Sequence, residues 1–315
     1  DLTLPVKDGQ HICHEVRRES EVPIIVLTSR TTEIDEVMAM TRRDVPAWDR
    51  LENVRTCRLS LLDREGMDGL IAAFVPDIVI HLAAIASPTH NDIMEIFQTN
   101  VKGTENLLEG LRKHCPAGTR VVLTSTAGVY GNVSLRNIPE NTPYSPVNYY
   151  GLSKVTMELL ARRYGEFDIR ILRPFNIIGA GQKENFLIPK LVRAFVSRLP
   201  VLKVGNLETV RDYTDVRFGS QVFVQMALRD VCSDKILNLC SGHGTSGEQI
   251  VEYLRQITGY SPEITVDKSF IRRGEIMRLV GDNSRLKAFM QDGIKPLHVK
   301  DILAEMVTAL EQQTA

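Results

Sequence analysis

The first half of the chain alternates between short apolar runs and longer amphipathic segments. The apolar runs are rich in β-branched residues and have the length of buried strands; they cover residues 24–27, 54–59, 77–81, 121–125 and 169–172. Between them, apolar positions three and four residues apart predict helices over 64–74, 91–115 and 149–166. Strands and helices in alternation, without hairpin signals, predict an α/β fold: a doubly wound parallel sheet with helices on both faces.

The pattern changes after Pro174. Helices predicted at 185–198, 220–228 and 299–310 mix with short strands predicted at 201–204, 236–239 and 264–266. Ser246 and Gln249 form a capping box for a helix that reaches Thr258, and Gly259 is its stop signal. Because no composition shift marks a linker, we expect the second half to form a smaller α/β lid packed on the sheet.

Composition narrows the class of protein. A chain of 315 residues, 43% hydrophobic and 24% charged, suits a soluble globular protein. The net charge of -1 gives no general attraction to nucleic acid or to an anionic membrane, so neither is an expected partner. The five cysteines are odd in number and widely spaced, which favours reduced thiols and a cytoplasmic location. No second ligand pair accompanies His11, Cys13 and His14, and we predict no metal site.

The candidate chemistry centres on Tyr150 and Lys154. Four residues apart on a helix, a phenol and an ammonium share one face. A nearby cation favours the phenolate and lowers the tyrosine pKa from its usual ~10, so the phenol can exchange a proton with a carbonyl or alcohol oxygen. Thr126, at the end of a predicted strand, is placed to hold that same oxygen. The alternative is an ordinary surface helix with a half-buried tyrosine and a solvated lysine.

The predicted sheet supplies a setting for this pair. In open α/β sheets, ligands bind beyond the carboxyl ends of the strands. Arg30, Ala83, Thr126 and Asn176 all fall at or just beyond predicted strand ends. We therefore expect these four residues to converge on one crevice beside Tyr150.

Five motifs occur in a fixed order along the chain. They are 81–84 (HLAA), 100–104 (NVKGT), 125–131 (STAGVYG), 150–154 (YGLSK) and 173–176 (RPFN). Together they resemble the extended short-chain dehydrogenase/reductase family, which contains NAD-dependent nucleotide-sugar epimerases, dehydratases and reductases. Within it, segments 204–216, 240–242, 272–275 and 281–284 look most like the GDP-4-keto-6-deoxy-mannose reductases.

The resemblance implies domains and catalytic roles. Residues 1–174, with a returning segment at about 207–239, would form the dinucleotide-binding domain, and 175–206 with 240–315 the substrate-binding domain. Thr126 and Tyr150 would contact the keto oxygen of the sugar, with Tyr150 giving the proton as hydride arrives from the nicotinamide. Lys154 would hold the nicotinamide ribose and tune the tyrosine.

The resemblance also implies two sets of binding residues. The cofactor would contact Gly9, Ser29, Arg30, Leu61, Ala83, Ala84, Lys154 and Phe175. The substrate, a nucleotide-diphosphate sugar, would contact Ser87, Thr126, Asn176, Asn185, Lys190, Arg211, Arg272 and Glu275. The planar donor fork of arginine suits diphosphate oxygens, whereas a solvated or ion-paired surface arginine is the alternative for each one.

Residues 28–30 bear on the choice of cofactor. We interpret them as the exit loop of the run 24–27, which would correspond to the second strand of the family, at whose end NAD-preferring members usually carry an acidic residue. The sequence there is Thr28-Ser29-Arg30, without a carboxylate. Serine and arginine suit a 2′-phosphate better than an aspartate does, so NADP(H) is favoured over NAD(H). Arg30 as a simple loop charge is the alternative.

Two positions depart from the family pattern. The family opens with a glycine-rich turn that holds the pyrophosphate, but residues 1–9 offer only Gly9, and Pro5 lacks an amide hydrogen. Either that turn is missing from this sequence, or the pyrophosphate site is rebuilt and dinucleotide binding is weakened. Ala127 and Gly128 stand where the dehydratases carry an acidic pair, which argues against water elimination.

We therefore predict an NADPH-dependent reductase of a GDP-linked 4-keto-6-deoxy sugar. A nucleotide-sugar epimerase with tightly bound NAD would use the same three residues, and a non-redox sugar-nucleotide-binding protein would keep the arginines alone. Family members usually dimerise through two long helices, here 91–115 and 149–166, so the resemblance implies a homodimer. The apolar faces of these helices do not by themselves distinguish a dimer interface from core.

Overall fold

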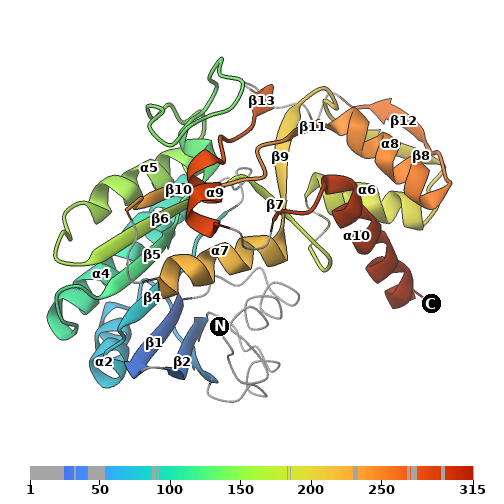
Figure 1. The fold of residues 1–315 in the computed structure, drawn as a ribbon. Helices are drawn as coiled ribbons and strands as arrows, with labels where there is room; N and C mark the ends of the chain where they lie inside the picture. The colour runs from blue at the N-terminus through green and yellow to red at the C-terminus, as the bar shows by residue number, and fades with distance from the viewer. Residues whose placement is uncertain are drawn as a thin grey trace.

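The computed structural model describes residues 25–31, 33–41, 54–86, 90, 92–182, 184, 186–229, 233–267, 270, 275–291 and 295–314. Within these residues, a seven-stranded sheet forms the centre of the larger part of the molecule, in the order β10-β6-β5-β4-β1-β2-β3 (Figure 1). Its strands are β1 (Ile25–Thr31), β2 (Glu33–Thr41), β3 (Val54–Arg58), β4 (Ile78–His81), β5 (Arg120–Thr124), β6 (Asp168–Pro174) and β10 (Ile236–Leu239).

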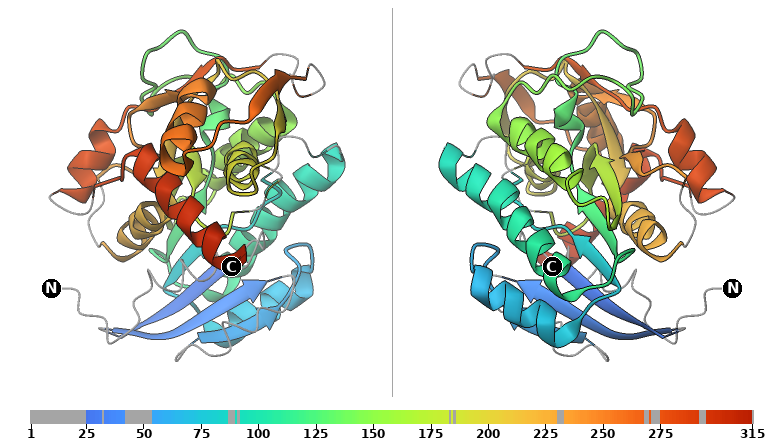
Figure 2. Two further views of the ribbon diagram at one scale, coloured as in Figure 1. Left: turned by 90° about the vertical axis from the view of Figure 1, so that its right-hand side faces the viewer. Right: turned by 90° about the vertical axis from the view of Figure 1, so that its left-hand side faces the viewer.

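Helices cover both faces of this sheet, as predicted (Figures 1 and 2). One face packs against α2 (Arg64–Phe74), α4 (Gly103–His114) and α5 (Tyr149–Ala161). The other packs against α7 (Val216–Leu228) and α9 (Ser284–Met290). Side chains of the central strands alternate between the two apolar clusters, which is the burial pattern of a strand covered on both sides.

Strand β1 is the exception to the parallel arrangement. It pairs antiparallel with β2, from which the single residue Thr32 separates it, and antiparallel with β4, where Ile25 lies opposite His81 and Thr28 opposite Ile78. The other pairs of this sheet are parallel. The expected absence of hairpins was wrong here, because the apolar residues of β2 supply a partner strand directly after β1, and adjacent strands with a tight connection pair antiparallel.

The predicted helix over 91–115 is interrupted by one wider turn. It consists of α3 (Ile93–Phe97), a π-helical turn η2 (Gln98–Lys102) and then α4. Such turns are often found at functional sites. Here the turn contains the fully buried Asn100, whose contacts are described below.

The smaller part of the molecule is a lid with its own core. Strands β7 (Asn176–Ile178), β9 (Val210–Asp215), β11 (Gly244–Ser246) and β13 (Arg278–Leu279) form one sheet, and β8 (Val201–Val204) pairs with β12 (Glu263–Val266). Helices α6 (Leu187–Val196), α8 (Gly247–Thr258) and α10 (Val299–Thr314) pack around an apolar cluster beside these strands. The capping box of Ser246 and Gln249 is present, and Gly259 ends α8 with a φ of 62°.

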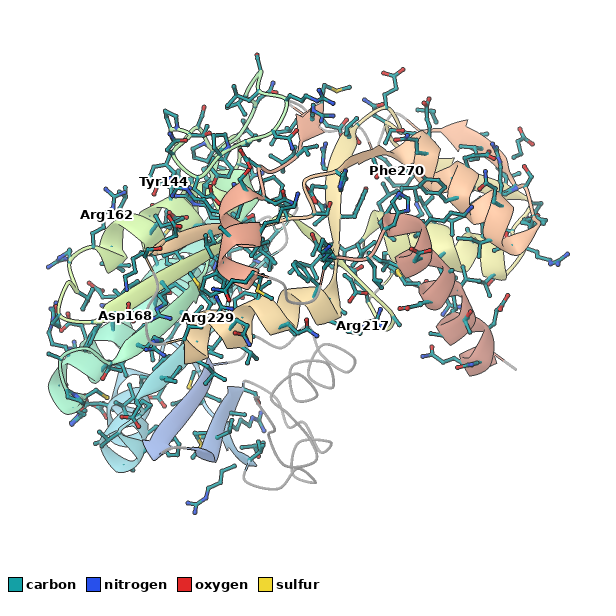
Figure 3. All side chains as sticks on the ribbon, in the orientation of Figure 1. Tyr144, Arg162, Asp168, Arg217, Arg229 and Phe270 are labelled. Carbon is teal, nitrogen blue, oxygen red and sulfur yellow. The ribbon has the colours of Figure 1, made fainter. Side chains whose placement is uncertain are left out.

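The return from the lid to the large sheet begins at Val216. Within the segment expected at about 207–239, β9 belongs to the lid sheet, whereas α7 and β10 pack in the large body. Helix α9, expected in the substrate domain, packs against β10 and joins the same large core. Arg217 in the first turn of α7 forms an ion pair with Glu305 of α10 at 2.5 Å and so links the two parts (Figure 3).

Two arginines of the large sheet bind the carboxyl end of α7. The fully buried Arg170 donates from one guanidinium nitrogen to the carbonyl oxygens of Met226 and Arg229, at 2.6 and 2.7 Å, and from another to Asp168 at 2.5 Å. Arg120 donates to the carbonyl oxygen of Ala227 at 2.5 Å. The last carbonyls of a helix carry partial negative charge, so these cations stabilise α7 against the sheet (Asp168 and Arg229 are labelled in Figure 3).

Among the described helices, none is both long enough and apolar enough to span a bilayer.

We predict that Arg170→Met lowers the free energy of unfolding by ~3 kcal/mol, because it leaves the carbonyl oxygens of Met226 and Arg229 without this buried donor and removes one of the cations that pair with Asp168. Urea denaturation followed by circular dichroism measures the loss. Arg193→Met, which removes a cation 45% exposed on α6, is the matched control and should cost less than ~1 kcal/mol. Equal losses in the two variants would contradict the assigned role of Arg170.

Candidate active site

Helix α5 begins so that Tyr150 lies in its first turn. The side chain of Asn148 caps the helix by accepting a hydrogen bond from the Gly151 backbone N–H at 2.8 Å. Ser153 then donates from its hydroxyl to the carbonyl oxygen of Tyr150 at 2.7 Å. The start of the helix is therefore fixed on both sides of Tyr150, whose side chain is partly exposed.

Thr126 lies just beyond the carboxyl end of β5. Its backbone is extended, with φ -161° and ψ 151°, and it precedes a single 3-10 turn at Ala127–Val129. Its hydroxyl oxygen accepts a hydrogen bond from the Gly128 N–H at 3.1 Å. Because that bond uses a lone pair, the hydroxyl proton can still be donated to a ligand oxygen.

Gly151 allows α5 to touch the turn that contains Thr126. A Cβ at this position would lie 2.8 Å from the Gly128 carbonyl oxygen and 3.1 Å from the Pro146 Cβ. Real Cβ atoms do not approach a backbone oxygen that closely, so the contact requires glycine. This close approach brings the residue next to Gly151, the predicted proton donor Tyr150, against the turn of Thr126.

Lys154 is buried beneath this contact, with 2% of its surface exposed. Its ammonium donates to the Thr124 carbonyl oxygen at 2.7 Å and lies 3.8 Å from the sulfur of Met157. Burial lowers the pKa of Lys154 to about 7, and the Glu158 carboxylate one turn along opposes this by favouring the cation. The alternative of a solvated surface lysine is excluded.

A second polar group, Asn100, holds the loop after β4. Its side chain accepts from the Ile85 N–H at 2.8 Å and donates to the Ile85 carbonyl oxygen at 3.1 Å and to Ser153 at 3.0 Å. It therefore joins the loop after β4 to α5. The sequence motif contained Asn100, but its spacing gave no sign of these contacts, which depend on the π-helical turn.

His81 lies fully buried at the end of β4. It donates from Nε2 to the hydroxyl of Thr104 at 2.8 Å, because Thr104 gives its own proton to the Asn100 carbonyl oxygen. Burial and the nearby Lys154 charge lower the pKa of His81 to about 3, so the ring is neutral. This bond ties β4 to the helix that carries Asn100.

The carboxylate of Glu158 joins α5 to two strand ends. Arg173, at the end of β6, donates to its two oxygens at 3.0 and 2.6 Å. Ser125 donates to one of these oxygens, and Tyr144 donates to the other at 2.7 Å. Figure 3 labels Tyr144 beside α5. Sequence reasoning assigned no role to Glu158, although its position four residues after Lys154 places it on the same helix face.

The predicted cofactor residues differ in how they could meet a ligand. Lys154 and the partly exposed Ala84 lie at the carboxyl edge of the sheet, as the catalytic candidate Thr126 does. The side chains of Leu61, Ala83 and Phe175 are at least 93% buried, and the ring of Phe175 packs 6.4 Å from that of Tyr130 in a core cluster, so a ligand would meet their backbone atoms.

Ser29 and Arg30 do not converge on this edge. Because β1 runs antiparallel to β4, the end of β1 that contains them lies beyond the amino end of β4, on the opposite edge of the sheet. The expected crevice of Arg30, Ala83, Thr126 and Asn176 is thus not assembled around Arg30. Four other predicted contacts lie outside the described residues: Gly9, Ser87, Asn185 and Arg272.

The nicotinamide end of a dinucleotide fits the residues present. The buried ammonium of Lys154 makes one hydrogen bond to oxygen, and a ribose hydroxyl is a suitable second acceptor for its remaining protons. The Asn100 side chain holds the adjacent loop in place for a close backbone approach. Residues of the expected pyrophosphate turn, 1–9, lie outside the described part of the chain.

The predicted substrate residues lie on the lid sheet and its edges. Asn176 begins β7 opposite Tyr213 of β9, and Arg211 lies two residues earlier on β9. Glu275 is partly buried and precedes β13, which pairs with the Arg211 end of β9. Lys190 lies farther along the lid on α6, with its ammonium 4.3 Å from the centre of the Phe270 ring (Figure 3).

Asp212, next to Arg211, organises the loop between the two parts of the molecule. Its fully buried carboxylate accepts hydrogen bonds from the backbone N–H groups of Ser241, Gly242 and Gly281, at 2.8, 2.9 and 3.3 Å. Burial raises the pKa of Asp212 above its usual value, and the hydrogen bonds oppose this shift without cancelling it. The strand that carries Arg211 is thereby fixed to the end of β10.

A cavity of about 550 Å³ is lined by residues of α7, α9 and the start of α10, and by Tyr213 of β9 and Ser241 after β10. Helices α7 and α9 cover the face of the sheet opposite α5, whereas α10 belongs to the lid. The cavity therefore does not contain the catalytic candidates Thr126, Tyr150 and Lys154.

Comparisons with known proteins agree with this geometry. The profile of the NAD dependent epimerase/dehydratase family matches residues 7–240. A GDP-6-deoxy-D-talose 4-dehydrogenase from Aggregatibacter actinomycetemcomitans is 34% identical over 73% of this chain and 79% of its own. A GDP-6-deoxy-D-mannose reductase from Pseudomonas aeruginosa is 31% identical over 73% and 78%. The solved structure of RMD from Pseudomonas aeruginosa complexed with NADPH is 27% identical, with a TM-score of 0.74 over 85% of this chain and 94% of its own.

We predict that Gly151→Ala lowers kcat about tenfold or more, since its Cβ pushes α5 away from the Thr126 turn and small displacements of catalytic groups are costly. Steady-state kinetics and thermal unfolding of the variant are the measurements. Gly69→Ala on α2 is the matched control, because a Cβ there meets nothing within 4 Å, and it should keep full activity. An unchanged kcat in Gly151→Ala would show that the close approach is not needed.

Lys154→Met should change how stability depends on pH. The folded protein releases the Lys154 proton near pH 7, whereas the unfolded chain keeps it to about pH 10.5. Between these values the unfolded state binds one more proton, so this group makes the wild type less stable as pH falls from about 10.5 to about 7, by at most ~1.4 kcal/mol per pH unit. Urea denaturation at several pH values should show that the variant becomes more stable relative to the wild type as the pH falls over that range. Parallel curves of stability against pH for the two proteins would contradict the lowered pKa of Lys154.

Proposed function

The chain belongs to the NAD dependent epimerase/dehydratase family, and we propose that it uses NADPH to reduce the keto group of a GDP-linked 4-keto-6-deoxy sugar. The observation that carries the proposal is the contact of the Thr126 turn with the first turn of α5 above the buried Lys154. The family makes the chain an NAD(P)-dependent enzyme of the extended short-chain dehydrogenase/reductase type. Two relatives named for GDP-linked 6-deoxy sugars support the substrate class.

Thr126, Tyr150 and Lys154 have separate roles at the keto oxygen. Thr126 donates its hydroxyl proton in a hydrogen bond that orients the oxygen. Tyr150 gives its phenolic proton to the same oxygen as negative charge develops there. Lys154, held by the Thr124 carbonyl, binds the ribose and stabilises the charge left on the phenol. NADPH supplies the hydride when it is bound.

The lid binds the nucleotide in this proposal. Arg211 and Arg272 bind the diphosphate, because a guanidinium matches two phosphate oxygens at once. Glu275 binds the nucleotide ribose, and Asn176 lies where the nicotinamide meets the sugar. The fixed position of β9, through Asp212, supports the role of Arg211.

Support for NADPH comes from the solved NADPH complex of a relative at 27% identity. Ser29 and Arg30 do not support this choice of cofactor, since β1 carries both to the far edge of the sheet. A homodimer is part of the proposal: Leu152 and Leu159 leave 42% and 45% of their surface exposed on α5, which gives that helix an outward apolar face.

The test is consumption of NADPH with a GDP-linked 4-keto-6-deoxy-mannose as substrate. We expect the wild type to oxidise one NADPH per sugar reduced and Tyr150→Phe to lose at least about 100-fold in kcat. Tyr149→Phe is the matched control, since Tyr149 is the neighbouring tyrosine and 52% exposed, and it should keep wild-type activity.

Two outcomes would replace the proposal. Interconversion of two nucleotide sugars without net change in NADPH absorbance would make the protein an epimerase with tightly bound NAD. Binding of the GDP-sugar without binding of either dinucleotide, measured by calorimetry, would make it a non-redox sugar-nucleotide-binding protein.

A further inference from the structure

The carboxylate of Glu158 makes more contacts than its ion pair requires. Arg173 alone reaches both oxygens with two nitrogens, at 3.0 and 2.6 Å, which satisfies the charge. The hydroxyls of Ser125 and Tyr144 add two further bonds, one to each oxygen. Glu158 and Ser125 are each 1% exposed, so no water competes for these positions. The extra hydrogen bonds therefore connect α5 to Ser125, just after β5, and to Tyr144.

Of these contacts, Ser125 bears most directly on the position of Thr126. It directly precedes Thr126, and its backbone N–H extends the pairing of β5 with β6 by donating to the Leu172 carbonyl oxygen at 2.7 Å. In extended backbone, successive side chains point to opposite sides. When the side chain of Ser125 is bound to Glu158, the side chain of Thr126 is therefore directed the other way, out of the buried network.

We infer that Glu158 is a positioning residue, which fixes the hydroxyl of Thr126 relative to Tyr150 by binding Ser125. The inference rests on the proposed function for its kinetic consequence. Glu158 lies on the same helix as Tyr150 and four residues after Lys154, so the carboxylate connects the helix of the proton donor to the strand end of the second hydroxyl. A charge-assisted hydrogen bond between buried partners is short and directional, and suits this purpose better than an apolar contact.

Arg173 extends the hydrogen-bond network beyond Glu158. It donates to the hydroxyl of Tyr130 at 2.9 Å and to the Glu140 carbonyl oxygen at 2.8 Å, and Tyr130 donates to Asn238 of β10 at 2.6 Å. The network thus ends on β10 on one side and on Ser125 on the other. Loss of Ser125 alone removes one bond and leaves the ion pair of Glu158 and Arg173 in place.

The experiment compares Ser125→Ala, Thr126→Ala and the double variant, with Glu158→Gln as a second probe. We expect Ser125→Ala to lower kcat about tenfold with KM changed less than about twofold, because a misplaced hydroxyl affects the reaction more than binding. In the Thr126→Ala background the same change should cost less than about twofold, since the group it positions is gone. Glu158→Gln should show the same split between kcat and KM.

A readout without turnover accompanies the kinetics. The order parameter of the Thr126 methyl group, measured by NMR on the unliganded protein, should fall in Ser125→Ala, while the melting temperature stays within about 4 °C of the wild type. Ser220→Ala is the matched control: its hydroxyl is also buried and bonded, to the Val216 carbonyl oxygen at 2.8 Å, but on α7. It should change neither kcat nor the Thr126 order parameter.

Three results would overturn the inference. They are an unchanged order parameter of Thr126 in Ser125→Ala, an unchanged kcat in that variant, and equal effects of Ser125→Ala with and without Thr126. A wild type that does not oxidise NADPH contradicts the proposed function instead. In that case the order parameter alone decides whether Ser125 and Glu158 position Thr126.

Discussion

The site depends on one buried ion pair, Arg173 with Glu158, whose charged atoms lie 2.6 Å apart and whose side chains are 2% and 1% exposed. Removing one partner of such a pair leaves a buried charge, which typically costs ~3–5 kcal/mol. Glu158 comes from α5 and Arg173 from the end of β6. The pair therefore fixes the helix of Tyr150 and Lys154 against the sheet edge at which Thr126 stands.

Around this pair, the molecule consists of the carboxyl edge of the large sheet and the lid. Glu158 holds this edge from one side, and Asn100 holds it from the other by binding both backbone groups of Ile85. The lid is attached through β7 and β9 and fixed by the buried Asp212 carboxylate. The proposed catalytic groups thus lie on packed elements, which suits chemistry that needs fixed distances, while the proposed nucleotide contacts lie on the smaller body.

Local signals in the sequence predicted local structure well. The capping box of Ser246, the stop at Gly259 and the shared face of Tyr150 and Lys154 depend on neighbours a few residues apart, so spacing alone reveals them. The direction of β1 and the burial of Phe175 depend on partners far along the chain, and sequence reasoning missed both. The same holds for Glu158, whose role depends on Ser125, 33 residues away. The pattern of residues predicts a chemistry, but it does not reveal the hydrogen-bond network around Glu158.

The most direct measurement is a crystal structure of the protein with NADPH and an unreactive GDP-linked sugar analogue that carries an oxygen at the C4 position. We expect this oxygen to lie within hydrogen-bond distance of both the Thr126 hydroxyl and the Tyr150 phenol, with Lys154 bound to the nicotinamide ribose and Ser125 still bound to Glu158. A sugar bound away from these two hydroxyls, or a Tyr150 side chain directed away from the sheet edge, would contradict the proposed reaction.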